Sequence, residues 1–112
     1  MRKGIIQEME KRGSKRVEGK HRTEIIYQNN TYEGVIENIS WSGTNVLTDP
    51  LDPEIVFTPD DLLDLKFLSP EGDTVILKCI IIWASKIPPA NERNRLGLQL
   101  LERPWKEIAF FF

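Results

Sequence analysis

Hydrophobic and polar residues alternate over short stretches for most of the chain, with the period of two that is typical of half-buried β-strands. Turn-forming residues, above all Asn, Gly, Pro and Asp, separate these stretches. The pattern predicts six strands, at 23–27, 31–37, 44–48, 62–68, 74–85 and 95–100. The first two should form a hairpin across the turn 28–30, and the fourth and fifth a second hairpin across 69–73.

The stretch 74–85 is largely apolar on both faces over its second half. Its side chains should alternate between two faces, one with Val75, Leu77, Cys79, Ile81 and Trp83 and the other with Ile76, Lys78, Ile80, Ile82 and Ala84. We expect one of these faces to fill the barrel. The other face also needs a cover. We expect this cover to be the segment 104–112, as a short helix in which Pro104 occupies the first turn and the aromatic residues supply the apolar side.

Six short strands with a turn signal at nearly every boundary predict an all-β fold. The expected architecture is a six-stranded antiparallel barrel or split barrel with a short C-terminal helix. Residues 1–10 have a few apolar positions at helical spacing and are interpreted as a tail or a short helix, so that the barrel domain occupies 11–112. A chain of 112 residues can build one such core.

The composition, 40% hydrophobic and 29% charged, is that of an ordinary globular protein. The longest apolar run, 79–84, is far shorter than the roughly 20 residues that cross a bilayer, and the N-terminus lacks an apolar signal region. We therefore expect a cytoplasmic protein. The single cysteine, Cys79, is interpreted as core packing, and without a His and Cys cluster we expect no metal and no cofactor.

The candidates for catalysis are few. His21 is the only histidine, and no Ser, Cys or acid stands at a catalytic spacing from it, so we interpret it as a strand-edge residue. Asp60 and Asp61 lie in a loop without an accompanying motif and are interpreted as exposed turn formers. We therefore predict that the protein is not an enzyme.

Charge is distributed unevenly along the chain. Residues 1–22 hold eight Lys or Arg and three Glu, a local charge of +5, which leaves seven basic and fourteen acidic residues, or −7, for 23–112. A flexible basic arm on an acidic body would draw an anionic ligand to one edge and disfavours broad binding to DNA or RNA. A solvated tail is the alternative interpretation of the same arm.

Two short segments combine into one candidate site. Arg12 and Arg16 offer two planar guanidiniums, which can hold phosphates, meet guanine O6 and N7 or stack on a base. Beyond the intervening stretch 17–37 come Asn38, Ser40 and Gly43, which add an amide, a hydroxyl and a glycine that lets the backbone approach a ligand. The combination suits a ligand that carries both phosphates and purine edges.

These residues resemble the two signatures of the PilZ domains, bacterial receptors for cyclic di-GMP. Arg12 and Arg16 match the motif R-x-x-x-R, and Asn38, Ser40 and Gly43 match D/N-x-S-x-x-G. The strand 95–100 resembles the closing strand of the family. The resemblance implies a six-stranded barrel with a C-terminal helix. It also implies cyclic di-GMP as the ligand of these five residues. Four residues are secondary candidates for the site: Lys11, Lys15, Trp41 and Gly97. Trp41 could stack on a guanine or pack against the barrel wall, and we favour packing.

Three functions from different classes follow. The first is a stand-alone receptor that relays cyclic di-GMP to a protein partner, which the resemblance connects with motility, biofilm or exopolysaccharide control. The second is a PilZ-like adaptor that binds a protein partner without the nucleotide. The third, a barrel that binds single-stranded nucleic acid, ranks low because the body carries −7 where such a module needs a basic groove.

Overall fold

The computed structural model describes residues 17–102 and 108–111, so the expectations for the tail 1–10 and for Lys11, Arg12, Lys15 and Arg16 fall outside the described residues. All six predicted strands are confirmed. Their bounds are β1 (Val17–Tyr27), β2 (Asn30–Ile39), β3 (Gly43–Thr48), β4 (Leu62–Leu68), β5 (Thr74–Lys86) and β6 (Asn94–Leu100).

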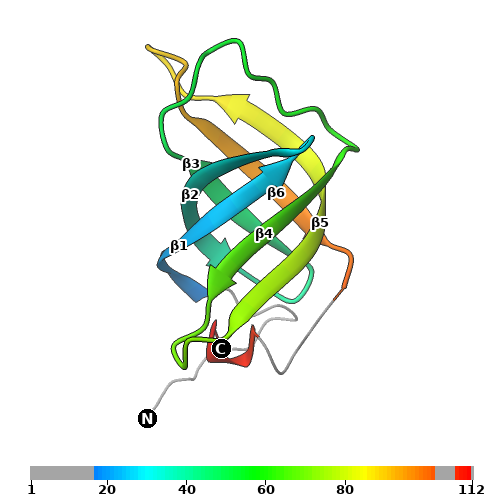
Figure 1. The fold of residues 1–112 in the computed structure, drawn as a ribbon. Coiled ribbons are helices and arrows are strands. Elements are labelled where there is room, and N and C mark those ends of the chain that lie inside the picture. Colours follow the sequence, from blue (N-terminus) through cyan, green and yellow to red (C-terminus); the bar gives the residue numbers. More distant parts are fainter. Residues whose placement is uncertain (1–16, 103–107, 112) are drawn as a thin grey trace.

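The strands close into an antiparallel barrel in the order β1-β2-β3-β6-β5-β4 (Figure 1). The long connection 49–61 crosses one end of the barrel, so that β6 lies between β3 and β5 although it is last in the sequence. The seam between β1 and β4 is short and pairs only 24–26 with 64–66. The predicted barrel is therefore confirmed, and the non-local pairing of β3 with β6 joins 43–47 to 95–99.

The core follows the alternation of the sequence. Every strand contributes fully or nearly fully buried side chains, among them Ile25, Ile36, Val46, Leu65, Leu77 and Leu96. Cys79 is buried among them as predicted, and its burial raises the pKa of the thiol to about 12, because the thiolate would lose its hydration there.

The prediction that Trp83 shares a face with Ile81 is wrong. Between Ile81 and Trp83 the strand β5 advances two residues while its partner β6 advances one, from Leu98 to Gly97, which is the signature of a β-bulge. The bulge ends the alternation, so Ile81 stays buried while Ile82 and Trp83 are 50% and 42% exposed. Trp83 therefore belongs to the outer surface of the barrel.

The described part of the C-terminal segment is one turn long. Of the predicted helix 104–112, residues 103–107 and 112 lie outside the described residues, and a 3-10 helix, η1, spans Ala109–Phe111. Figure 1 shows η1 at the end of the barrel where β1 begins. Phe110 and Phe111 pack there on the rings of His21 and Phe67. These aromatic contacts hold η1 at the barrel end. On the outer face of β5, Ile76 remains 48% exposed among the described residues.

The opposite end of the barrel is held by a buried tyrosine. The Tyr27 hydroxyl donates to Asp61 Oδ2 at 2.5 Å and accepts the Thr58 N–H at 3.1 Å, and its ring stacks on Phe57 with centroids 5.0 Å apart. Asp61 is thus an anchor of the loop 49–61 and more than a turn former. Asp60, with a φ of 76°, is exposed as predicted.

Candidate ligand-binding site

An open depression of about 350 Å³ lies on the outer surface of the barrel beside the β2–β3 turn. Four neighbouring strands, β2, β3, β6 and β5, contribute to it. Its lining consists of Asn38, Ser40, Ser42, Gly43, Thr44, Asn45, Ile82, Trp83, Gly97, Leu98 and Gln99. The depression therefore brings together four residues that the sequence singled out, namely Asn38, Ser40, Gly43 and Gly97.

Ser40 and Gly43 shape the turn that forms one rim of the depression. The Ser40 N–H donates to the Gly43 carbonyl at 2.8 Å, and the buried Ser40 hydroxyl donates to the same oxygen at 3.4 Å. Thr44 Oγ1 donates to the Asn38 carbonyl at 2.7 Å. Ser40 and Thr44 thus use their hydroxyls on the backbone, which leaves the side-chain amide of Asn38 among the groups that face a ligand.

Two residues in the lining of the depression, Gly43 and Gly97, have no room for a side chain. A Cβ on Gly43 would meet the Leu98 carbonyl of the neighbouring strand, and a Cβ on Gly97 would overlap the indole of Trp83. The Trp83 indole therefore lies directly over the Gly97 backbone. A flat, half-exposed aromatic ring on a floor without side chains offers a stacking surface to a planar ligand.

Sequence reasoning missed seven residues of this lining, including the three with an indole or an amide side chain: Trp83, Asn45 and Gln99. Strict alternation puts Trp83 on the same face as the buried Ile81, and the two amides have no local signal, since only the pairing of β3 with β6 brings them beside the motif. Trp41, a secondary candidate, does not belong to the lining, and its side chain is 41% exposed.

The described lining is entirely uncharged. It contains no Lys, Arg, Asp, Glu or His, and its polar groups are amides, hydroxyls and backbone. Neutral donors and acceptors beside an aromatic ring suit the edge and face of a nucleobase. A phosphate needs cations, which the described lining does not provide, so a nucleotide here would need basic groups from elsewhere in the chain.

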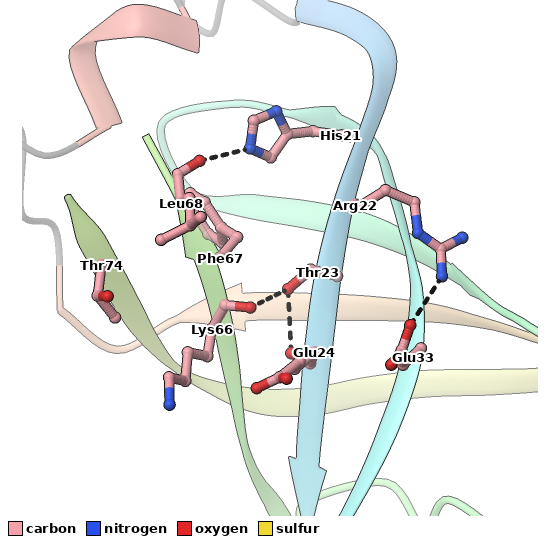
Figure 2. A pocket seen from close by; sticks show the side chains of 9 residues that line it. All are labelled: His21, Arg22, Thr23, Glu24, Glu33, Lys66, Phe67, Leu68 and Thr74. Carbon is pink, nitrogen blue, oxygen red and sulfur yellow. Dashed lines mark hydrogen bonds and ion pairs between the residues drawn. The ribbon is translucent and has the colours of Figure 1, made fainter. Parts of the chain in front are cut away.

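A second depression, of about 540 Å³, lies at the seam between β1 and β4. Figure 2 shows two side chains of β1, His21 and Thr23, directed at backbone carbonyls of β4 beside this depression. His21 Nε2 donates to the Leu68 carbonyl at 3.0 Å, and Thr23 Oγ1 donates to the Lys66 carbonyl at 3.2 Å. These bridges occupy carbonyls that a ligand could otherwise use.

Arg22, a cation in the lining of this second depression, is already bonded to carboxylates of the barrel. Arg22 holds the carboxylate of Asp49 with two hydrogen bonds, at 2.7 and 3.0 Å, and bonds Glu33 at 3.1 Å. The Arg22 hydrogen bonds lower the pKa of Asp49 below its usual value. Although the seam depression is the larger, four of its polar side chains, those of His21, Arg22, Thr23 and Glu33, bond within the wall, and none of its residues belongs to either motif. We therefore take the depression beside the β2–β3 turn as the candidate site.

Within 17–102 and 108–111, no three His, Cys, Asp or Glu side chains gather in a way that could hold a metal ion. The same residues form no helix with the length and apolar character needed to cross a membrane.

The described residues thus form a small closed antiparallel β-barrel of six strands with an uncharged depression beside the β2–β3 turn. The sequence matches the model of the PilZ domain family over residues 10–106. The chain therefore belongs to the PilZ domain family. No protein of curated function matches it.

Solved structures share the fold at low sequence identity. The Bacillus subtilis inhibitor of motility MotI/DgrA has a TM-score of 0.67 and 18% identity, over 92% of this chain and 49% of that one, so this chain spans about half its length. The PilZ domain of Escherichia coli YcgR with cyclic di-GMP has a TM-score of 0.65 and 15% identity, over 91% of this chain and 86% of that one. Borreliella burgdorferi PlzA in complex with cyclic di-GMP has a TM-score of 0.56 and 21% identity, over 88% of this chain and 48% of that one.

Proposed function

We propose that the chain is a non-enzymatic receptor for cyclic di-GMP. The observation that carries this proposal is the uncharged depression in which Asn38, Ser40 and Gly43 meet Gly97 and the Trp83 indole. Membership in the PilZ family supports it, as do two structural neighbours, YcgR and PlzA, that were solved with cyclic di-GMP.

In the proposed complex the two parts of the site divide the ligand between them. The neutral depression takes a guanine, with Asn38 at the base edge, Gly43 in the turn at the rim, and the Trp83 indole, seated on Gly97, at the base face. Arg12 and Arg16 supply the charge that the depression lacks, on the phosphates and on guanine O6 and N7. Lys11, Lys15 and Trp41 remain secondary candidates that would add charge or stacking at the rim.

We further propose that the barrel domain occupies 11–112, acts in the cytoplasm and passes the signal to a protein partner in motility, biofilm or exopolysaccharide control. Exposed apolar side chains on the outer surface support a protein contact. Among them, Leu62 on β4 is 66% exposed and Ile76 on β5 is 48% exposed. The structural likeness to an inhibitor of motility agrees with this direction.

Isothermal titration with cyclic di-GMP tests the receptor. We expect saturable heat for the native chain and none for GTP at the same concentration. The Arg12→Ala/Arg16→Ala variant should lose binding by at least about a hundredfold, because each charged hydrogen-bonding group contributes about 1.5–3 kcal/mol.

The matched control is Arg2→Ala/Lys3→Ala, which removes the same charge from the same arm outside the motif. If both double variants lose affinity equally, the arm acts through net charge and the two-arginine motif has no special role. If the folded native chain gives no heat, the receptor proposal is refuted and the adaptor that binds no nucleotide takes its place.

A further inference from the structure

One amide in the depression has no partner within the described residues. Asn45 lies at the middle of β3, on the outward-facing side of an alternating strand whose neighbours Thr44 and Val46 are buried. Its side chain is half-buried, lines the depression, and makes no hydrogen bond with any residue that the structure describes. A half-buried amide with four unused hydrogen-bonding positions gains most from a ligand that fills them.

The register places Asn45 between the other recognition elements. It pairs with Asn38 of β2 on one side and with Gly97 of β6 on the other, and Gly97 pairs in turn with Trp83 of β5. Adjacent strands are about 4.8 Å apart, so this row of four residues spans roughly 14 Å. A purine that stacks on the indole above Gly97 would present its edge toward β3, where Asn45 is the next side chain.

The chemistry of the amide fits one edge of guanine. An amide offers a carbonyl acceptor beside an N–H donor, and the Watson–Crick edge of guanine offers the complement, N1–H beside O6. The Hoogsteen edge of guanine has two acceptors, N7 and O6, which suit a guanidinium. An amide therefore suits the Watson–Crick edge of the base, and an arginine suits its Hoogsteen edge.

We propose that Asn45 is a further ligand-contacting residue, whose side-chain amide accepts the guanine N1–H and donates to O6. This inference rests on the proposed function, since it assumes that cyclic di-GMP binds in this depression. It assigns a role to a residue outside both sequence motifs and makes Asn45, together with Asn38, the part of the site that orients the base.

The test is titration of the full chain with cyclic di-GMP for the native protein and for Asn45→Ala, Asn45→Asp and Asn30→Ala. Asn45→Ala should bind about thirtyfold more weakly, the factor expected for a lost pair of hydrogen bonds. Asn45→Asp keeps the shape, loses the donor and adds a charge that repels the ligand, so its loss should be larger. Asn30→Ala removes the same amide from an exposed position at the start of β2, outside both depressions, and should bind as the native chain does.

A second readout separates contact from a structural effect. In the native complex the imino proton of a bound guanine should give an NMR signal protected from exchange with water, and in the Asn45→Ala complex this protection should be lost while the thermal midpoint of the free protein stays unchanged. If the native chain binds but Asn45→Ala binds within twofold of the native affinity, or keeps the imino protection, then Asn45 does not contact the ligand and the receptor proposal still stands. Absence of binding by the native chain overturns the receptor proposal as well.

Discussion

The contact between Trp83 and Gly97 can be tested by adding one methyl group. A Cβ at position 97 would overlap the Trp83 indole, whereas the obstruction at Gly43 is a backbone carbonyl, that of Leu98. A side chain at the surface can move aside, but a strand cannot move without losing its pairing. We therefore expect Gly97→Ala to fold, with the indole displaced from the floor of the depression.

The size of the effect follows from the covered area of the indole. Trp83 is 42% exposed, so more than half of its surface is covered. For a large aromatic residue this is on the order of 140 Å², worth at most about 3.5 kcal/mol at about 25 cal/mol/Å². A displacement that uncovers half of this area costs about 1.5–2 kcal/mol. Replacing Gly by Ala in a strand returns about 0.5–1 kcal/mol, which leaves a net destabilisation of about 1 kcal/mol.

A double-mutant cycle measures this contact in the free energy of unfolding. Gly97→Ala, Trp83→Ala and the double variant are unfolded in urea and followed by far-UV circular dichroism, because removal of a tryptophan changes the fluorescence signal. Without the indole, Gly97→Ala should be neutral or stabilising, so the coupling should reach about 1–2 kcal/mol. Gly43→Ala is the control, because its cost should be the same with and without Trp83. Equal destabilisation by Gly97→Ala in both backgrounds would refute the packing argument.

Two further predictions concern the rest of the barrel. Tyr27→Phe removes the hydroxyl that holds Asp61 and the connection 49–61. Its free energy of unfolding, measured by urea titration, should fall by about 2 kcal/mol, the cost of two lost hydrogen bonds. Tyr32→Phe, whose hydroxyl has no hydrogen bond among the described residues, should cost little, and equal losses would contradict the assigned anchor. The thiol of Cys79, buried and with its pKa raised to about 12, should react with a thiol reagent at pH 8 only upon unfolding, so rapid reaction of the native protein would show that the core opens there.

Local patterns in the sequence were sufficient to predict all six strands. An alternating run such as 62–68 can bury its apolar side chains in only one way, and turn residues such as Asn29 and Gly72 mark where the chain must reverse. The motif Asn38, Ser40 and Gly43 was also readable, because a short turn between two strands brings its members together without help from distant residues.

The rest of the candidate site depended on contacts between distant segments. The bulge that turns Trp83 outward arises where β5 pairs with β6, and the sequence of β5 alone does not predict it. Asn45 faces the depression beside Gly97 only because β6 inserts between β3 and β5. The sequence by itself thus determined the strands, the turns and the motif, since these follow from local alternation and backbone preference. The tertiary structure alone decided which side chains meet over the floor of the depression, because barrel closure sets the register between strands that the sequence keeps far apart.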